Sequence, residues 1–123
     1  MTLDHVGFAV ADFVKSRDFY TRALAPLGIA IVMDGDGYAG MGRDGRAQFW
    51  FNAGKPSSGG THIAFVADDR AQVRAFHAAA LAAGGTNNGD PGLRPQYHPN
   101  YYGAFVIDLN GHNIEAVCHK PES

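Results

Sequence analysis

The chain has 123 residues and a hydrophobic content of 46%, which is enough to bury one core but hardly two. Its formal net charge is -2 and it has no cluster of lysines and arginines, which argues against nucleic acid or an anionic membrane and favours a small-molecule partner. It shows no basic start followed by an apolar run and no stretch near the roughly 20 apolar residues that span a bilayer, so we expect a cytoplasmic protein.

The first half predicts a strand, a helix and three further strands. Residues 3–10 alternate so that one face is bulky while the other carries His5 and small side chains. Asp12 is placed to cap a helix that runs to about Leu27, where Gly28 supplies a left-handed stop. Short strands are expected at residues 29–33, 38–42 and 47–52. The first half is therefore predicted to be a βαβββ module.

The second half repeats this order. Residues 62–67 predict a strand with His62 on its open face, and a helix is expected over about residues 69–83. The last two strands are expected to form a hairpin around Asn110-Gly111. Ahead of them, the stretch from Asn87 to Asn100 is longer than its counterpart and rich in glycine, proline and tyrosine, so we interpret it as a candidate substrate loop.

The two halves are copies of one unit. His5-Val-Gly-Phe-Ala-Val-Ala-Asp returns as His62-Ile-Ala-Phe-Val-Ala-Asp-Asp, and the same constant offset aligns Gly28 with Gly85. An ungapped match of this length is typical of a duplicated supersecondary unit. We expect one domain over residues 1–123, with module 1 at 1–53, a flexible linker at 54–60 and module 2 at 61–119.

Three side chains of the repeat form a candidate metal site. His5 and His62 are equivalent residues on the first strands, and Glu115 lies within the hydrophobic last strand, where we align it with Gln48 of module 1. Each residue alone is more typical of an ordinary strand position, but two imidazoles and a carboxylate can hold Zn, Ni, Mn, Fe or Co as a divalent ion and leave positions open for substrate. Because Cys118 is the only cysteine, a cysteine cage is excluded.

On these residues the chain resembles the vicinal oxygen chelate (VOC) superfamily, also called the glyoxalase/bleomycin resistance/dioxygenase group. The resemblance covers nearly the whole chain and rests on Asp4-His5-Val6-Gly7-Phe8-Ala9-Val10-Ala11-Asp12, Thr61-His62-Ile63-Ala64-Phe65 and Asp108-Leu109-Asn110-Gly111-His112-Asn113-Ile114-Glu115. It implies an α+β fold in which two tandem βαβββ modules form a U-shaped mixed sheet around one divalent metal that chelates vicinal oxygens of the substrate.

The resemblance also implies roles for individual residues. His5, His62 and Glu115 match the metal ligands, and Glu115 is a candidate catalytic group in a lyase or isomerase that acts on a small oxygenated metabolite or thiol adduct. Gln48 stands where glyoxalase I enzymes of similar size have a second glutamate. A neutral amide cannot be a general base, so strict glyoxalase I activity is disfavoured and Gln48 becomes a candidate substrate contact.

Other reactions of the superfamily stay open. A metal-free sequestration protein of the bleomycin-resistance type would bind its drug in a groove lined by aromatics such as Trp50, Tyr101 and Tyr102. Fosfomycin-modifying thiol transferases and extradiol dioxygenases share the set of two histidines and a glutamate. The transferases carry a threonine where this chain has Gly7, and the dioxygenases are generally larger.

The stretch around Pro95 to Gly103 supplies secondary candidates. His98 is a candidate acid/base, with Tyr101 or Tyr102 donating a hydrogen bond to substrate, although these rings could equally pack and His98 could bond the loop backbone. Arg94 is a candidate for binding a substrate carboxylate or phosphate, or else an exposed loop residue. Many short members of the superfamily share each site across a two-fold dimer, so we expect a homodimer with two shared sites.

Overall fold

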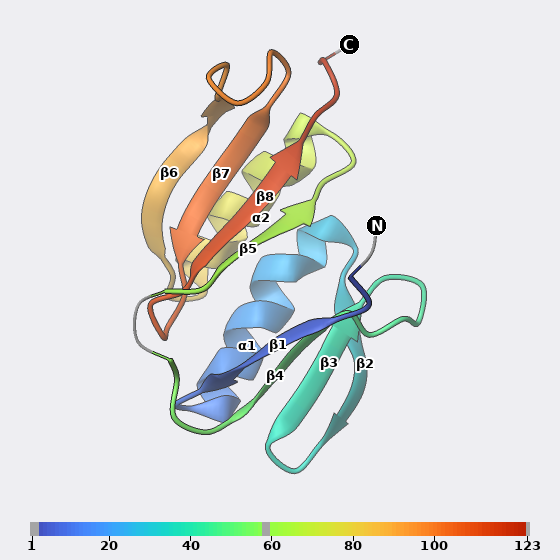
Figure 1. Ribbon diagram of the computed structural model, residues 1–123, viewed down its shortest axis with the longest axis vertical. Coiled ribbons are helices and arrows are strands. Elements are labelled where there is room, and N and C mark those ends of the chain that lie inside the picture. The colour runs from blue at the N-terminus through green and yellow to red at the C-terminus, as the bar shows by residue number, and fades with distance from the viewer. Residues whose placement is uncertain (1–2, 58–59, 123) are drawn as a thin grey trace.

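The computed structural model describes residues 3–57 and 60–122, so the expected linker is described except for Ser58 and Gly59, which lie outside the described residues. Module 1 contains β1 (Val6–Val10), α1 (Phe13–Leu24), the short 3-10 helix η1 (Ala25–Leu27), β2 (Ala30–Gly35), β3 (Tyr38–Gly42) and β4 (Phe49–Ala53). Module 2 contains β5 (His62–Val66), α2 (Arg70–Ala82), β6 (Thr86–Leu93), β7 (Tyr102–Ile107) and β8 (Asn113–Cys118) (Figure 1).

The helices begin where the repeat predicts. Asp12 and Asp69 are the N-cap residues, and their side chains accept hydrogen bonds from the backbone N–H of Lys15 and Gln72, at 3.0 and 2.8 Å. The first helix ends earlier than expected, at Leu24, and continues only as η1. A proline in this segment removes one backbone donor, which ends the α-helical bonding and favours the tighter turn.

The glycines that end the two helical segments are not at equivalent positions of the repeat, although the sequence offset aligned Gly28 with Gly85. Gly28 has a φ of 75°, but in module 2 the left-handed glycine is Gly84, with a φ of 109°, rather than Gly85. The 3-10 turn η1 lies only in module 1, and the two left-handed glycines are 56 rather than 57 residues apart.

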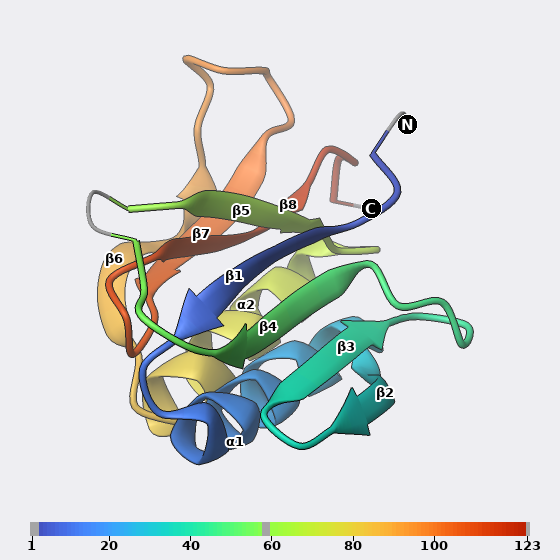
Figure 2. The same ribbon diagram turned by 60° about the horizontal axis from the view of Figure 1, so that its bottom comes forward.

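The fold class is confirmed as α+β with two βαβββ-type modules. The eight strands form two four-stranded mixed sheets, with the orders β1-β4-β3-β2 and β5-β8-β7-β6. In each sheet the first strand of the module pairs in parallel with the last, and the remaining pairs are antiparallel. Both helices cover the same side of the two sheets, which leaves the opposite face of each sheet open (Figures 1 and 2). Of the candidate site residues, Trp50, His62 and Glu115 lie on these open faces.

The expected substrate loop is shorter than predicted. The strand β6 (Thr86–Leu93) takes up residues 87–93 of that stretch, and only the following residues connect it to β7. The prediction was wrong because glycine and proline, which are typical of loops, are tolerated at register shifts and on edge strands. Here the pairing with β7 shifts register between Asn87 and Gly89 and between Gly89 and Gly92, and Pro91 lies on an edge strand, where a missing N–H is tolerated.

A buried polar cluster joins the modules at one end. Tyr20 on α1 donates a hydrogen bond to the carboxylate of Asp108, which also accepts bonds from the backbone N–H of Asn110 and His112 at 2.8 and 2.9 Å. The His112 ring is fully buried and stacks on Phe8 of β1, with 4.1 Å between ring centroids. Burial, followed by the nearby Asp108 charge, raises the pKa of Tyr20 well above its ordinary value.

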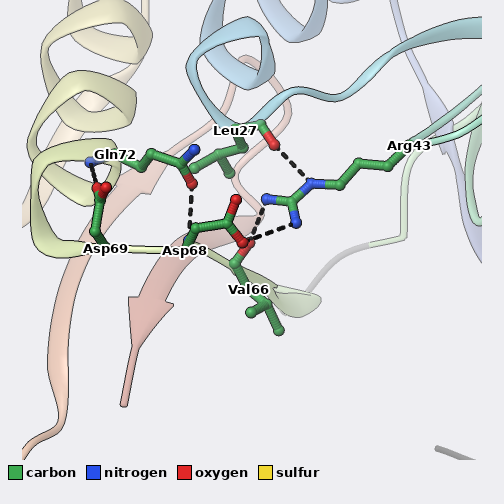
Figure 3. A network of polar contacts seen from close by, with 6 residues as sticks. All are labelled: Leu27, Arg43, Val66, Asp68, Asp69 and Gln72. Carbon is green, nitrogen blue, oxygen red and sulfur yellow. Dashed lines mark hydrogen bonds and ion pairs between the residues drawn. The ribbon is translucent and has the colours of Figure 1, made fainter. Parts of the chain in front are cut away.

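Arg43, which follows β3, joins the modules at the other end (Figure 3). Its guanidinium donates to the backbone oxygens of Leu27 and Val66 at 2.7 and 3.0 Å and lies 3.3 Å from a carboxylate oxygen of Asp68. Val66 is the last residue of β5, so this one side chain ties the edge strand of module 2 to module 1. Within the described residues, no helix has the length and apolar character needed to cross a membrane.

Candidate metal and substrate site

Glu115 is a buried carboxylate on the open face of the second sheet. It lies on β8 opposite Ala64 of β5. This face of the sheet points away from the helices, yet Glu115 is only 1% exposed. Nε2 of His62, the first residue of β5, is 2.9 Å from Oε1 of Glu115, while the His62 side chain remains 52% exposed. Parallel pairing of β5 with β8 therefore places an accessible imidazole beside a buried carboxylate.

The second oxygen of Glu115 is bound by a tyrosine. Tyr101, immediately before β7, donates its hydroxyl hydrogen to Oε2. Burial, followed by this hydrogen bond to the carboxylate, raises the pKa of Tyr101 above its ordinary value. The phenol therefore stays protonated at neutral pH and fixes Oε2, while Oε1 faces the imidazole of His62.

Phe105 and Arg94 extend this face. Phe105 on β7 pairs with Glu115, and its ring lies 6.2 Å from the His62 ring. The Arg94 guanidinium lies 5.4 Å from the Phe105 ring and donates to the backbone oxygen of Asp90 at 2.7 Å. Arg94 is thus a half-buried residue beside Phe105, the strand partner of Glu115, rather than an exposed loop arginine.

The strand register corrects the expected match between Gln48 and Glu115. His62 pairs with Asn113 and Ala64 with Glu115, whereas in module 1 Gly7 pairs with Trp50 and the backbone N–H of Val6 bonds to Gln48. Since His5 matches His62, the residue that matches Glu115 is Trp50. The sequence alignment was wrong by two residues, because alternation along a strand fixes the face but not the position along it.

Trp50 occupies the open face of the first sheet. A Cβ atom at Gly40, its partner on β3, would lie 2.8 Å from the indole ring, so the ring packs directly on the glycine backbone. Module 1 therefore has an aromatic surface where module 2 has the carboxylate. The two open faces differ in chemistry although their backbones repeat.

His5 and Gln48 lie beside a cavity between the modules. The cavity has a volume of about 370 Å³ and lies between the edge strands β1 and β5, and its lining includes His5, Gln48 and His62 but not Glu115. His5 precedes β1, and its Nδ1 is 2.8 Å from a carboxylate oxygen of the exposed Asp4. The hydrogen bond from His5, with its positive charge when protonated, lowers the pKa of Asp4.

The ligand set is only partly assembled within one chain. Over residues 3–57 and 60–122, no group of three or more His, Cys, Asp or Glu side chains is placed to hold a metal ion. His62 and Glu115 are together, with donor atoms of the kind that divalent transition metals prefer, whereas His5 is bound to Asp4. Of the three expected ligands, only His62 and Glu115 therefore lie together within one chain.

The remaining candidates, Tyr102 and His98, lie in two different parts of the structure. Tyr102, next to Tyr101 in sequence, points to the helix side of the sheet, where Arg70 lies 5.1 Å from its ring centroid. His98 lies in the turn between β6 and β7, and its Nδ1 accepts a hydrogen bond from the backbone N–H of Asn100 at 3.1 Å. The structure thus brings Tyr101 to Glu115 but places Tyr102 on the opposite face.

Sequence reasoning missed Phe105. Counting outward from a two-residue Asn110-Gly111 turn would place Val106 opposite Glu115, whereas the observed register pairs Glu115 with Phe105. The contact of Tyr101 with Glu115 had no signal in the sequence either, since it depends on how the turn after β6 lies over the sheet.

Comparison with known proteins identifies the family. Residues 2–116 match the family described as Glyoxalase/Bleomycin resistance protein/Dioxygenase superfamily. A glyoxalase/bleomycin resistance protein from Albidiferax ferrireducens T118 is similar at 29% identity and a TM-score of 0.85, covering 96% of this chain and 99% of that chain. A glyoxalase/bleomycin resistance protein/dioxygenase family enzyme from Burkholderia phytofirmans PsJN has the same fold at 19% identity and a TM-score of 0.74, covering 98% and 100%.

No curated protein matches the chain. The match over residues 2–116 agrees with the two βαβββ-type modules of the structure. The chain therefore belongs to the glyoxalase/bleomycin resistance protein/dioxygenase superfamily.

Proposed function

We propose that this chain is a divalent-metal-dependent, glyoxalase-like enzyme of the lyase or isomerase type that acts on a small oxygenated metabolite or thiol adduct. The observation that supports the proposal is the buried Glu115, whose Oε1 lies 2.9 Å from Nε2 of the accessible His62. A carboxylate at 1% exposure is costly unless it is bound, and here its surroundings provide an imidazole and a phenol rather than a structural ion pair with arginine or lysine.

In this proposal His62 and Glu115 hold the metal together with His5, which a second copy of the chain supplies in a homodimer. A divalent metal bound there acts as a Lewis acid toward adjacent oxygens of the substrate. Tyr101 keeps Oε2 of Glu115 occupied and orients the carboxylate. Glu115 is then the acid/base group of the chain. His98 is a second candidate for moving a proton.

The open faces supply the substrate contacts. Arg94 stands beside Phe105 with a charge that suits an anionic substituent, and Trp50 offers an aromatic surface on module 1. Gln48, on the cavity between β1 and β5, is proposed to contact the substrate as a neutral donor and acceptor. With Trp50 in place of a second glutamate, we propose that the reaction is not that of glyoxalase I itself.

A specific observation favours a second candidate, metal-free sequestration of a small molecule. Both Glu115 oxygens already have partners within one chain, from Tyr101 and His62, so the carboxylate needs no metal to be satisfied. In that case the aromatic faces around Trp50 and Tyr101 bind the ligand. Thiol transfer and extradiol ring cleavage are further reactions open to a metal-bound form.

The test is metal content by inductively coupled plasma mass spectrometry, with mass in solution measured by light scattering. The proposal expects near-stoichiometric Zn, Ni, Mn, Fe or Co in a dimer, lost in His62→Ala and Glu115→Ala and retained in the control Asp36→Ala, at an exposed position between β2 and β3. Loss in His5→Ala as well would support the shared site. Protein that stays metal-free after reconstitution with each ion, yet binds a hydrophobic ligand, would favour sequestration instead.

A further inference from the structure

A second cavity lies at the start of α2, on the helix side of the second sheet. Its volume is about 370 Å³, and it is bounded by the first turns of α2 and by the segment that follows β8. Six charged side chains line it: Asp68, Asp69, Arg70, Arg74, Lys120 and Glu122. Tyr102 faces this side of the sheet while its neighbour Tyr101 faces Glu115, so this cavity and the candidate metal site lie on opposite faces of the same strand.

The three acidic side chains already have partners. Asp68 lies 3.3 Å from Arg43, Asp69 caps α2 by accepting the backbone N–H of Gln72, and Glu122 lies 3.5 Å from Arg74. Over the described residues, neither Arg70 nor Lys120 forms an ion pair. The cavity therefore has two cationic side chains, Arg70 and Lys120, with no acidic group of the described chain at ion-pair distance.

Of Arg70 and Lys120, Arg70 has the more unusual surroundings. Its Nε is buried, with no hydrogen-bond partner among the described residues. Such a donor is costly when it is unbound, and nearly all buried polar groups in folded proteins have a partner. The guanidinium is held by the Tyr102 ring, at 5.1 Å from the centroid, and Arg74 lies against the same ring at 5.8 Å. Two arginines one helical turn apart are thus fixed beside a cavity, with donors unused on Arg70.

We propose that this cavity binds a small anion, a phosphate or a carboxylate, through Arg70, with Lys120 as a second contact. A planar guanidinium offers paired donors that suit the oxygens of either group. The arginine is already oriented by Tyr102, so binding costs little side-chain entropy. The site is separate from the proposed metal-dependent reaction, because none of its lining residues is a hydrogen-bond partner of His62 or Glu115 among the described residues.

The test is a titration of the full-length protein followed by amide signals in nuclear magnetic resonance. Inorganic phosphate is added in one series and acetate in another, with ionic strength held constant by sodium chloride. A saturable shift confined to residues 69–74 and 118–122 is expected from at least one of the two anions, and the one that saturates identifies the chemistry of the ligand. Arg70→Gln should weaken binding about tenfold or more, as expected for loss of a charged hydrogen bond.

Arg22→Gln is the matched control, since Arg22 is an exposed helical arginine paired with Asp18. It should leave the binding unchanged. Lys120→Gln, at an exposed position, gives an independent variant if Arg70→Gln fails to fold, and it should weaken binding several-fold. Lack of a saturable shift with both anions would overturn the proposal, as would equal weakening in Arg22→Gln or unchanged binding in both Arg70→Gln and Lys120→Gln.

Discussion

Replacing Tyr20 with phenylalanine should weaken the connection between the modules by a predictable amount. The ring is 1% exposed and remains in the variant, so no cavity forms and the loss is confined to the hydrogen bond with Asp108. Asp108 keeps two backbone donors, from Asn110 and His112 at 2.8 and 2.9 Å, but both bond to Oδ1, so Oδ2 of the buried carboxylate loses the donor that Tyr20 supplies. A hydrogen bond to a charged group contributes about 1.5–3 kcal/mol, which is the expected loss in the free energy of unfolding.

Urea unfolding followed by circular dichroism measures this loss, with the exposed Tyr38→Phe as the control. The variant should unfold at lower urea with an unchanged m-value, and its Tm should fall by roughly 3–5 °C per kcal/mol. A loss below about 0.5 kcal/mol for Tyr20→Phe, or an equal loss in Tyr38→Phe, would refute the assigned role of this bond.

The same bond predicts a pH dependence. The pKa of Tyr20 is raised in the folded state above the ordinary value of 10.0, chiefly by burial, so folding favours the protonated phenol. The contribution of this group to the free energy of unfolding is fully present below pH 10. It is lost as pH rises further, because the Tyr20 phenol then ionises only in the unfolded chain. The difference between wild type and Tyr20→Phe should shrink above that pH by about 1.4 kcal/mol per unit. A constant difference would contradict this account.

Two further substitutions test the module contact and the candidate site. Arg43→Gln removes the bonds to Leu27, Val66 and Asp68 from a side chain that is 32% exposed. Urea unfolding should therefore show a decrease of about 1–3 kcal/mol in the free energy of unfolding. The control Arg46→Gln, at a more exposed position, should show little change. Tyr101→Phe leaves Oε2 of the buried Glu115 without its donor, so the free energy of unfolding should fall by about 1–3 kcal/mol in the same assay. The control Tyr97→Phe, at an exposed position, should leave it unchanged. Equal effects of the two substitutions would show that the Tyr101 bond is unimportant.

The sequence by itself determined the modules and the start of each helix. The repeat aligned Asp12 with Asp69, and both are N-caps, because a cap depends on side-chain and backbone atoms within one turn. Alternation placed His62 and Glu115 on the open face of their strands, and this is where they meet. Interactions that act over a few residues could therefore be predicted from local order alone.

Only the tertiary structure decided which residues oppose one another across strands. The sequence aligned Gln48 with Glu115, but the register gives that place to Trp50, since sliding a strand by two residues keeps the same face and leaves the pattern unchanged. Pairing with β7 likewise made a strand of residues 86–93 despite their glycines and proline. Contacts of Tyr101 with Glu115 and of Arg70 with Tyr102 join segments far apart along the chain, and their geometry is fixed only when the sheets and helices pack.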